Sequence, residues 1–423
     1  MLVTLLAFIF VLGVLVFIHE FGHFILAKMV GIRVERFSLG FPPRMIGKKI
    51  GDTDYCLSWV PIGGYVKMSG MIDESMEADS IKGEPWEFMS KPYYQRFLVI
   101  FAGPLMNILL AVLIFAAMTY ITGISEALGP MVGDVRQDSY VASLGFQKGD
   151  LLTQINNQPV ETWNEVMKQV HGKQNVSVQW MRGDSLMNGN FAATFADSLP
   201  QSVPPVVGSV IPDFPADSIG MKEGDRIVSI NDTAIVTWND LTAIIHKRPD
   251  RAVTVVWERD GKQLSSDAVP RKDATDGLGK IGIAYALKQK EVGPGKALAS
   301  GFTFSYNLTY MVYKSLKRIF TGQESVKNAF GGPIQIAKMA GDSARAGAGN
   351  LFVFMAFLSL NLGFLNLLPV PVLDGGHLLI LTIEAVIRRP ISTKAKMIVQ
   401  QIGMALLLIL MVFVIINDIR NIL

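Results

Sequence analysis

Long apolar stretches alternate with polar segments along the chain, and four of the apolar stretches are long enough to cross a membrane. A spanning helix needs about 20 mostly apolar residues. The first stretch runs without a charge from Leu2 to Ile18 and continues past a polar interruption to Ala27. The other three run over residues 97–125, 351–373 and 397–417. We therefore predict a multi-pass α-helical membrane protein with four spans.

A fifth stretch, Ala297–Tyr313, is uncharged but carries Ser, Thr, Asn and Tyr, and Lys314, Lys317 and Arg318 follow it. This pattern is typical of a basic amphipathic helix that lies in the membrane interface. We therefore interpret the stretch as an interfacial helix rather than as a fifth span.

The charges beside the predicted spans indicate their orientation. Lys and Arg gather after the first span, from Lys28 to Lys49, and between the third and fourth spans, from Arg388 to Lys396. Because cytoplasmic loops carry an excess of these residues, we expect both segments in the cytoplasm. The N-terminus, the region between the second and third spans, and the C-terminus then lie outside. The first span has no basic start and no small-residue cleavage site, so we expect it to be retained rather than removed as a signal peptide.

The region between the second and third spans has a different composition, with Gly, Pro, Asp and short β-branched runs. It repeats itself at an offset of 75 residues: Gly149-Asp150 matches Gly224-Asp225, and Thr162-Trp163-Asn164 matches Thr237-Trp238-Asn239. Self-similarity at a fixed period is the mark of repeated units. Each unit is predicted to contain a strand, a small helix, the Gly-Asp pair, a strand, an Asn turn, a helix and a strand.

The Gly-Asp pair, the apolar strand and the Asn turn together resemble a PDZ domain, a fold that binds extended peptides at a sheet edge. We therefore predict a periplasmic insert of two α+β PDZ-like domains, 126–205 and 206–290. Residues 1–125, before the insert, contain the first two spans. After the insert come an interfacial region, 291–350, and the last two spans, 351–423. Two β-rich domains without a peptide groove are the alternative.

Composition and charge narrow the function classes. Half of the residues are apolar, 18% are charged and the net charge is +3, which argues against a disordered protein and gives no case for nucleic-acid binding. The single cysteine, Cys56, excludes a disulfide framework and a four-cysteine zinc site.

His19-Glu20-Phe21-Gly22-His23 forms an HExxH motif near the end of the first span. Residues four apart lie on one side of a helix, so both imidazoles point the same way. Neutral imidazoles suit zinc, and the Glu between them can take a proton from a zinc-activated water. Ionisable groups at membrane depth are costly and usually functional, so we favour a catalytic zinc site over a structural role.

A catalytic zinc needs a third protein ligand, and Asp374 is the best candidate. It is the only acid in the third apolar stretch and its continuation to Ile383, and it follows a segment broken by Pro369 and Pro371. Broken backbone at membrane depth is tolerated where it lines a cavity. The motif and Asp374 both lie near the predicted cytoplasmic ends of their spans. For His171 and His246, which lie in the PDZ-like units, we favour surface or packing roles. His377 is closer to the membrane but follows the better candidate, Asp374.

The HExxH motif, the Asn-x-x-Pro-x-Pro-x-Leu-Asp-Gly segment from Asn366 to Gly375, and the PDZ-like pair together resemble the site-2 proteases over essentially the whole chain. The resemblance implies a zinc-dependent intramembrane endopeptidase of the bacterial inner membrane. It implies that His19, His23 and Asp374 bind Zn²⁺ and that Glu20 is the catalytic base.

Further segments match the same family. Phe101–Asn107 resembles its second-span motif, whose small residues let helices approach closely; an active-site role for Asn107 and pure packing both stay open. Pro61–Met68 resembles its membrane-associated β-hairpin, with a turn at Gly63 and Gly64 followed by Tyr65. The open edge of that hairpin is expected to hold unwound substrate, and an ordinary cytosolic hairpin is the alternative.

The broken third span is the other place where we expect unwound substrate, beside Pro369 and Pro371. By the family pattern, Asn366 hydrogen-bonds the substrate backbone. The acidic residues from Asp73 to Asp79 are expected to form a solvated loop.

The resemblance also implies the partners. The substrates are single-span membrane proteins already trimmed by a soluble protease, such as an anti-sigma factor in envelope stress signalling, and remnant signal peptides, all embedded in the lipid bilayer. The PDZ-like pair then excludes untrimmed substrates by size. Three alternatives stay open: a catalytically silent PDZ-containing membrane adaptor, a metal transporter, and a site-2 protease with a different regulatory substrate. The intact motif argues against the first, and the lack of a second charged pathway through the spans argues against the second.

Overall fold

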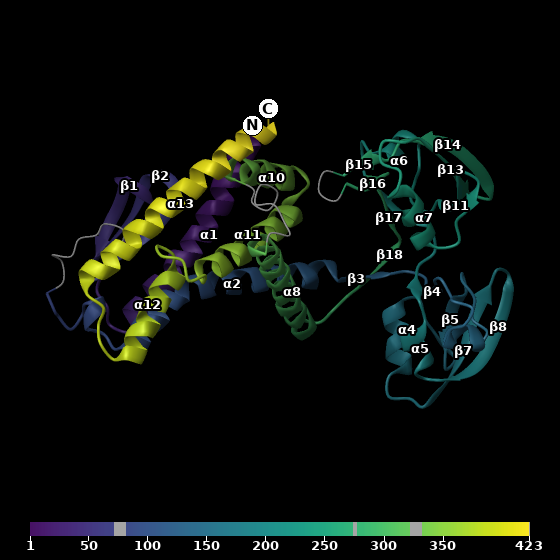
Figure 1. The fold of residues 1–423 in the computed structure, drawn as a ribbon, viewed down its shortest axis with the longest axis horizontal. Coiled ribbons are helices and arrows are strands. Elements are labelled where there is room, and N and C mark those ends of the chain that lie inside the picture. The colour runs from purple at the N-terminus through teal and green to yellow at the C-terminus, as the bar shows by residue number, and fades with distance from the viewer. Residues whose placement is uncertain (72–81, 274–276, 322–331, 423) are drawn as a thin grey trace. The chain divides into compact units, whose positions relative to one another are not determined.

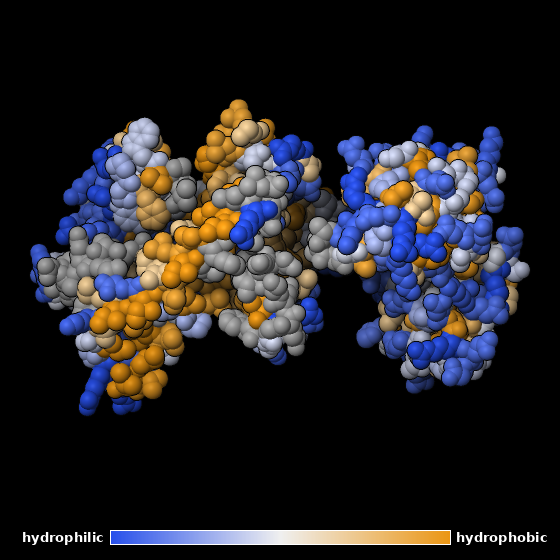
Figure 2. Space-filling model, turned by 45° about the horizontal axis from the view of Figure 1, so that its top comes forward, coloured by the Kyte–Doolittle hydropathy of each residue, from blue (hydrophilic) through white to orange (hydrophobic). Residues whose placement is uncertain are grey.

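The computed structural model describes residues 1–71, 82–273, 277–321 and 332–422. The chain divides into two compact units (Figure 1): unit 1 comprises Met1–Thr122 and Val292–Leu423, and unit 2 comprises Gly123–Glu291. Figure 2 shows apolar side chains gathered over unit 1, whereas the visible surface of unit 2 is mostly hydrophilic. The acidic segment from Asp73 to Asp79 lies outside the described residues.

Unit 1 is built from helices and one small sheet. The helices are α1 (Leu2–Met29), α2 (Tyr93–Thr122), α8 (Pro294–Phe320), α10 (Pro333–Arg345), α11 (Ala348–Asn366), α12 (Asp374–Ile387) and α13 (Thr393–Ile422), with a 3₁₀ turn at Phe88–Ser90. The sheet consists of β1 (Val34–Ile50) and β2 (Thr53–Met68). Within the described residues, four helices are long and apolar enough to cross a membrane: α1, α2, α11 and the Lys394–Ile416 part of α13. They coincide with the four predicted spans.

The third span ends earlier than the apolar stretch that predicted it. α11 stops at Asn366, and residues 367–373 form a non-helical connection to α12. Pro369 and Pro371 lie in this connection, where they lack the N–H groups that would continue a helix. Asp374 therefore begins a new helix. α8 covers the stretch that we interpreted as interfacial and is not among the four candidate spans of the described chain; its place in the interface stays a prediction.

The sheet of unit 1 differs from the hairpin that the sequence predicted. Both strands bend back, and residues 34–41 form the central strand. Ser38 pairs with Cys56 on one side and with Tyr65 on the other. The chain at Gly63 and Gly64 therefore crosses from one edge of the central strand to the other and is not a turn between two paired strands. The prediction was wrong because turn residues alone do not determine with which strand each arm pairs.

Small residues bring the helices of unit 1 into backbone contact around α2. A side chain at Gly22 of α1 would overlap with the carbonyl group of Ala102. A Cβ atom at Gly363 of α11 would lie 2.8 Å from the carbonyl oxygen of Pro104. Contacts between small residues are a common way for helices to associate in lipid. The close packing predicted from the Phe101–Asn107 segment is therefore present.

Unit 2 contains two β-rich repeats. The first repeat (residues 126–205) contains β4 (Met131–Val132), α3 (Tyr140–Ser143), β5 (Leu151–Ile155), β6 (Gln158–Pro159), α4 (Trp163–Val170), β7 (Asn175–Arg182), β8 (Ser185–Ala192), α5 (Phe195–Ser198) and β9 (Gln201–Ser202). The second repeat (residues 206–290) contains β10 (Val207–Val210), α6 (Pro215–Ser218), β11 (Arg226–Ile230), β12 (Thr233–Ala234), α7 (Trp238–Ile245), β13 (Val253–Arg259), β14 (Lys262–Ala268), β15 (Arg271–Lys272), β16 (Gly279–Lys280) and β17 (Ile283–Tyr285). At the two ends of the unit, β3 (Ile124–Ala127) pairs antiparallel with β18 (Leu287–Lys290).

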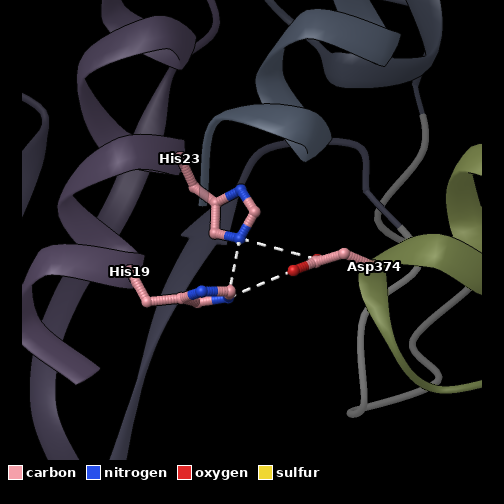
Figure 3. A group of neighbouring side chains, drawn as sticks. All are labelled: His19, His23 and Asp374. Atoms are coloured by element: carbon pink, nitrogen blue, oxygen red, sulfur yellow. Dashed lines mark hydrogen bonds and ion pairs between the residues drawn. The ribbon is translucent and has the colours of Figure 1, made fainter. Parts of the chain in front are cut away.

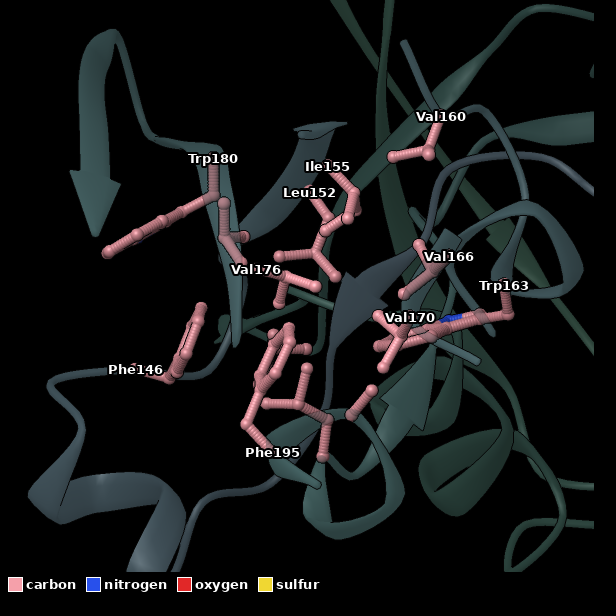
Figure 4. Packing of buried hydrophobic residues seen from close by; sticks show 14 of the residues in the cluster. Phe146, Leu152, Ile155, Val160, Trp163, Val166, Val170, Val176, Trp180 and Phe195 are labelled. Carbon is pink, nitrogen blue, oxygen red and sulfur yellow. The ribbon is translucent and has the colours of Figure 1, made fainter. Parts of the chain in front are cut away.

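The two repeats share the predicted order of elements, and each has its own hydrophobic core. In the first repeat the strands are ordered β8-β7-β5-β4-β9, and in the second a four-stranded sheet is ordered β12-β11-β13-β14. Figure 4 shows the first core, where Phe146 lies between Trp180 and Phe195; the ring centroids of Phe146 and Trp180 are 4.8 Å apart. Trp257 and Leu241 belong to the second core. Each sheet thus buries one face against its own helix.

The Gly-Asp pair that revealed the repeat places a buried carboxylate at the same point in each core. Asp150 accepts hydrogen bonds of 2.8 and 2.7 Å from Nε and Nη2 of Arg182, and Asp225 accepts two of 2.7 Å from Arg259. Both carboxyl groups are fully buried, and each also accepts a backbone N–H. In the first repeat the pair joins the end of β7 to the loop before β5, and in the second it joins the end of β13 to the loop before β11.

We expect Asp225→Asn to destabilise the second repeat by about 1–3 kcal/mol, because it leaves part of the Arg259 guanidinium without its buried partner. Burial opposes ionisation of Asp225, but hydrogen bonds from Arg259 outweigh it and hold the pKa below its ordinary value. The stabilisation is therefore full above the unfolded pKa, about 3.9, and is lost as the pH falls through the folded pKa.

Hydrogen exchange of the full chain measures this effect. At pH 7 the amides of β11 and β13 should exchange faster in Asp225→Asn than in the wild type, and the difference should shrink below pH 4. Asp232→Asn, at an exposed turn position, is the matched control. Equal protection in the wild type and Asp225→Asn at pH 7 would contradict the prediction.

Candidate metal centre

α1 brings His19 and His23 to one side of the helix, one turn apart. Their Nε2 atoms lie 3.3 Å from each other. Figure 3 shows both rings facing Asp374, which arrives from the first turn of α12. The carboxylate oxygens of Asp374 lie 3.1 Å from Nε2 of His19 and 3.5 Å from Nε2 of His23. Three side chains from two distant parts of the sequence thus converge on one point.

These separations fit a tetrahedral metal ion. Zinc bonds of about 2.0–2.1 Å in tetrahedral geometry place neighbouring ligand atoms about 3.3–3.4 Å apart. The two Nε2 atoms, 3.3 Å apart, match that value, and one ligand atom from each of the three residues lies within 4.8 Å of the others. Two imidazoles and one carboxylate are also a ligand set that zinc commonly takes in catalytic sites, where a fourth position stays open.

α2 fixes the orientation of His23. The Nδ1 atom of His23 lies 2.9 Å from the carbonyl oxygen of Val99. A carbonyl oxygen can only accept a hydrogen bond, so Nδ1 carries the proton. In the neutral ring the lone pair then belongs to Nε2, which is the atom that faces Asp374. A backbone partner behind a metal-binding imidazole is the usual way to set its tautomer.

Asn107 of α2 lies behind His19 in the same manner. Its Nδ2 atom lies 3.3 Å from Nδ1 of His19, and its Oδ1 atom is buried without a hydrogen-bond partner. If Nε2 of His19 binds a metal, Nδ1 carries a proton and needs an acceptor. Exchanging the two ends of the amide would give Oδ1 that proton and satisfy the buried oxygen. This geometry favours a supporting role for Asn107 at the site over packing alone.

Two glycines allow the surrounding elements to reach the centre. A side chain at Gly103 of α2 would overlap with the imidazole of His23. A Cβ atom at Gly64 of β2 would lie 2.7 Å from the carbonyl oxygen of Ser38 and 3.4 Å from Cγ of Glu20. The sheet therefore runs directly beside the Glu of the HExxH motif.

A cavity of about 740 Å³ opens at the three converging side chains. Among the predicted site residues, it is lined by His19, Glu20, His23, Asp374, Asn366, Gly64 and Tyr65. Gly63, Pro369 and Pro371 do not line it: Gly63 packs on the ring of Phe41, and Pro371 packs against Gly403 of α13. His377 also lines the cavity, whereas His171 and His246 belong to unit 2.

The sequence did not point to several residues that take part in this site or line its cavity. Val99 contributes only a backbone carbonyl, which leaves no sequence signal. Arg36 and Lys67 lie in the wall, although Arg36 had suggested only a cytoplasmic loop. Val372, two residues before Asp374, has φ of 82°, a strained conformation for a β-branched residue. Strain of this kind gathers at functional sites because the surrounding structure holds it in place.

Comparison with known proteins places this site in a family context. A model of peptidase family M50 matches residues 7–410. The chain is 31% identical to the regulator of sigma-E protease RseP from Escherichia coli, over 98% of each protein, and 32% identical to the regulator of sigma E protease from Haemophilus influenzae, over 97% of each. It is 33% identical, over 99% of each, to a Neisseria meningitidis protein named as a candidate zinc metalloprotease.

Among solved structures, the PDZ domain of an SdrC-like protein from Listeria monocytogenes aligns with 19% of this chain and 84% of that chain. The sequence identity is 25% and the TM-score is 0.18.

The supporting role of Asn107 predicts that Asn107→Ala weakens zinc binding by about 10–100-fold, because His19 loses the partner that orients it. Competition with a chelator of known affinity measures the change on the purified full chain. Asn361→Ala is the matched control, since the hydrogen bond of its side chain among the described residues goes to the Phe357 carbonyl of its own helix. Unchanged zinc affinity in Asn107→Ala would reduce Asn107 to a packing residue.

Proposed function

Because this chain belongs to peptidase family M50, the site-2 proteases, and is a metalloendopeptidase, we propose that it cleaves membrane-spanning segments with one zinc ion held by His19, His23 and Asp374. The convergence of the three ligand atoms from α1 and α12 is the observation that carries the proposal. Zinc, when bound there, polarises the scissile carbonyl and activates water. α1, which holds His19 and His23, is long and apolar enough to cross a bilayer.

Glu20 is the proposed general base. It follows the first histidine directly and lines the same cavity without belonging to the group of three ligands. Its carboxylate takes a proton from the attacking water and then delivers it to the leaving amine. The strand that contains Gly64 runs beside Glu20. It is proposed to confine the substrate to the side of α1 that carries Glu20, so that the base and the scissile bond lie at the same wall of the cavity.

The substrate must reach this wall in an extended form, because a helix encloses its own carbonyl groups in hydrogen bonds. Residues 64–68 pair with the central strand on one side, and no other strand of the described chain pairs with their second edge. The same residues line the cavity. We place the unwound segment along this edge, where main-chain hydrogen bonds hold it as an added strand. Asn366, at the end of α11, lines the same cavity and is proposed to hydrogen-bond the substrate backbone.

Charge at the helix ends supports an orientation for the chain. Lys28 lies in the last turn of α1, about 8 Å along the helix axis from His23, and Arg388 follows α12 directly. The excess of Lys and Arg at these ends favours the cytoplasmic side for both, with the termini and unit 2 outside. The metal centre then lies toward the cytoplasmic side of the inner membrane.

The substrates are proposed to be single-span membrane proteins that have lost their outer domain, together with signal-peptide remnants. The relatives named as regulators of sigma-E protease favour an anti-sigma factor in envelope stress signalling among them. We assign residues 126–205 and 206–290 as PDZ-like domains that exclude untrimmed substrates by size. The shared order of elements in the two repeats supports this assignment.

Glu20→Gln should lower cleavage by roughly 10²–10⁴-fold and leave zinc near one ion per chain, because Glu20 moves a proton but holds no metal. The assay uses a tagged single-span anti-sigma fragment without its outer domain, with zinc quantified in both proteins. Undiminished cleavage by Glu20→Gln would show that another group is the base. Bound zinc without any wild-type cleavage would favour a membrane adaptor instead.

Gly64→Val should lower cleavage by roughly 10²-fold with zinc content unchanged. The added side chain would collide with the Ser38 carbonyl and with Val16 of α1, and would push the substrate-binding edge away from Glu20. Gly13→Val is the matched control, since a Cβ atom at Gly13 meets no heavy atom within 4 Å. Equal loss of activity in both variants would argue against a specific role for the edge.

A further inference from the structure

Two like charges lie opposite each other in the wall of the cavity. Arg36 of the central strand pairs in register with Lys67 of the edge strand, and both residues line the cavity. Like charges directly opposite each other on neighbouring strands are destabilising. A sequence that breaks such a local rule usually does so at a functional site. The pair therefore indicates a function for positive charge at this position.

Neighbouring groups hold the two cations at the wall. Arg36 donates from Nη1 to the hydroxyl of Tyr65 at 3.1 Å, and its Nε lies 3.4 Å from Asp54. Asp54 also pairs with Arg44 at 3.1 Å. Lys67 lies 4.0 Å from Glu35, and both of these side chains are partly exposed.

The position of the pair along the strand sets its distance from the chemistry. Gly64 lies against Glu20, and Lys67 follows three residues later on the same edge. At about 3.3 Å per residue, the pair lies about 10 Å along the strand from the reacting bond. An extended segment on this edge therefore brings its third or fourth residue from the scissile bond beside Arg36 and Lys67.

We propose that Arg36 and Lys67 form a charge filter for the substrate. They favour an acidic side chain three or four residues to one side of the scissile bond and exclude a basic one. The filter rests on the proposed function, since it acts on a segment bound along residues 64–68. It also sets the register of cleavage: basic residues that flank a membrane-spanning segment must lie beyond Lys67 when the bond reaches the metal centre.

The experiment measures kcat/KM of the full chain in proteoliposomes on a series of single-span segments. The segments carry Glu, Gln or Lys at the third or fourth position on either side of the scissile bond. When the substitution lies on one particular side of the scissile bond, the wild type should cleave Glu segments at least about fivefold faster than Lys segments. The interaction with a unit charge about 4 Å away corresponds to about a fivefold change in rate even in water. Lys67→Glu should reverse the order.

Two further variants separate the filter from general damage. Arg36→Gln should narrow the ratio between Glu and Lys segments, and it replaces Lys67→Glu if that variant does not accumulate. Arg44→Gln should leave the ratio unchanged, since Arg44 also bonds Asp54 but does not line the cavity.

Equal cleavage of Glu and Lys segments by the wild type on both sides would overturn the filter and leave the proposed function intact. An equal fall of all rates in Lys67→Glu, without a change in order, would also overturn it. Cleavage of no segment by the wild type would overturn the proposed function, and the filter with it.

Discussion

The structure of unit 1 depends on one constraint: polar groups within an apolar layer must find partners from the protein itself. An isolated imidazole or carboxylate in an apolar layer would be costly, which applies to His19, His23 and Asp374. Each instead faces the other two at 3.1–3.5 Å. Because the cost is shared only when all three meet, the constraint also fixes where α12 must begin relative to α1.

α2 supplies partners for the Nδ1 atoms of both imidazoles, on the side of each ring away from Asp374. It contributes the carbonyl of Val99 to His23 and the amide of Asn107 to His19. These contacts require the backbones of α1 and α2 to approach closely, and Gly22 and Gly103 permit it. Packing and chemistry in this segment are therefore two consequences of the same close approach, since the small residues that join the helices also bring the supporting groups within hydrogen-bond distance.

The sequence predicted the parts of the site that follow from local periodicity. Two histidines four apart on a helix must share a face, and two prolines must interrupt one, so the motif in α1 and the break before Asp374 were predictable. The sheet was not, because Tyr65 could pair with the strand beside it in sequence or with Ser38 across the sheet, and local residues do not decide between them. Neither were the partner from Val99, which is backbone, nor the exclusion of Pro369 and Pro371 from the cavity wall.

An edge strand that binds substrate as proposed also needs a source of selectivity. Main-chain hydrogen bonds along residues 64–68 would hold almost any extended segment equally well, since every residue except proline offers the same donor and acceptor. Gly64 adds no discrimination, because its role is to let the sheet approach α1. Any choice among sequences must therefore come from side chains around the edge strand, and Arg36 and Lys67 are the charged ones on the sheet that line the cavity. In the proposed filter, these two positive charges distinguish acidic from basic residues of the substrate, which main-chain pairing cannot do.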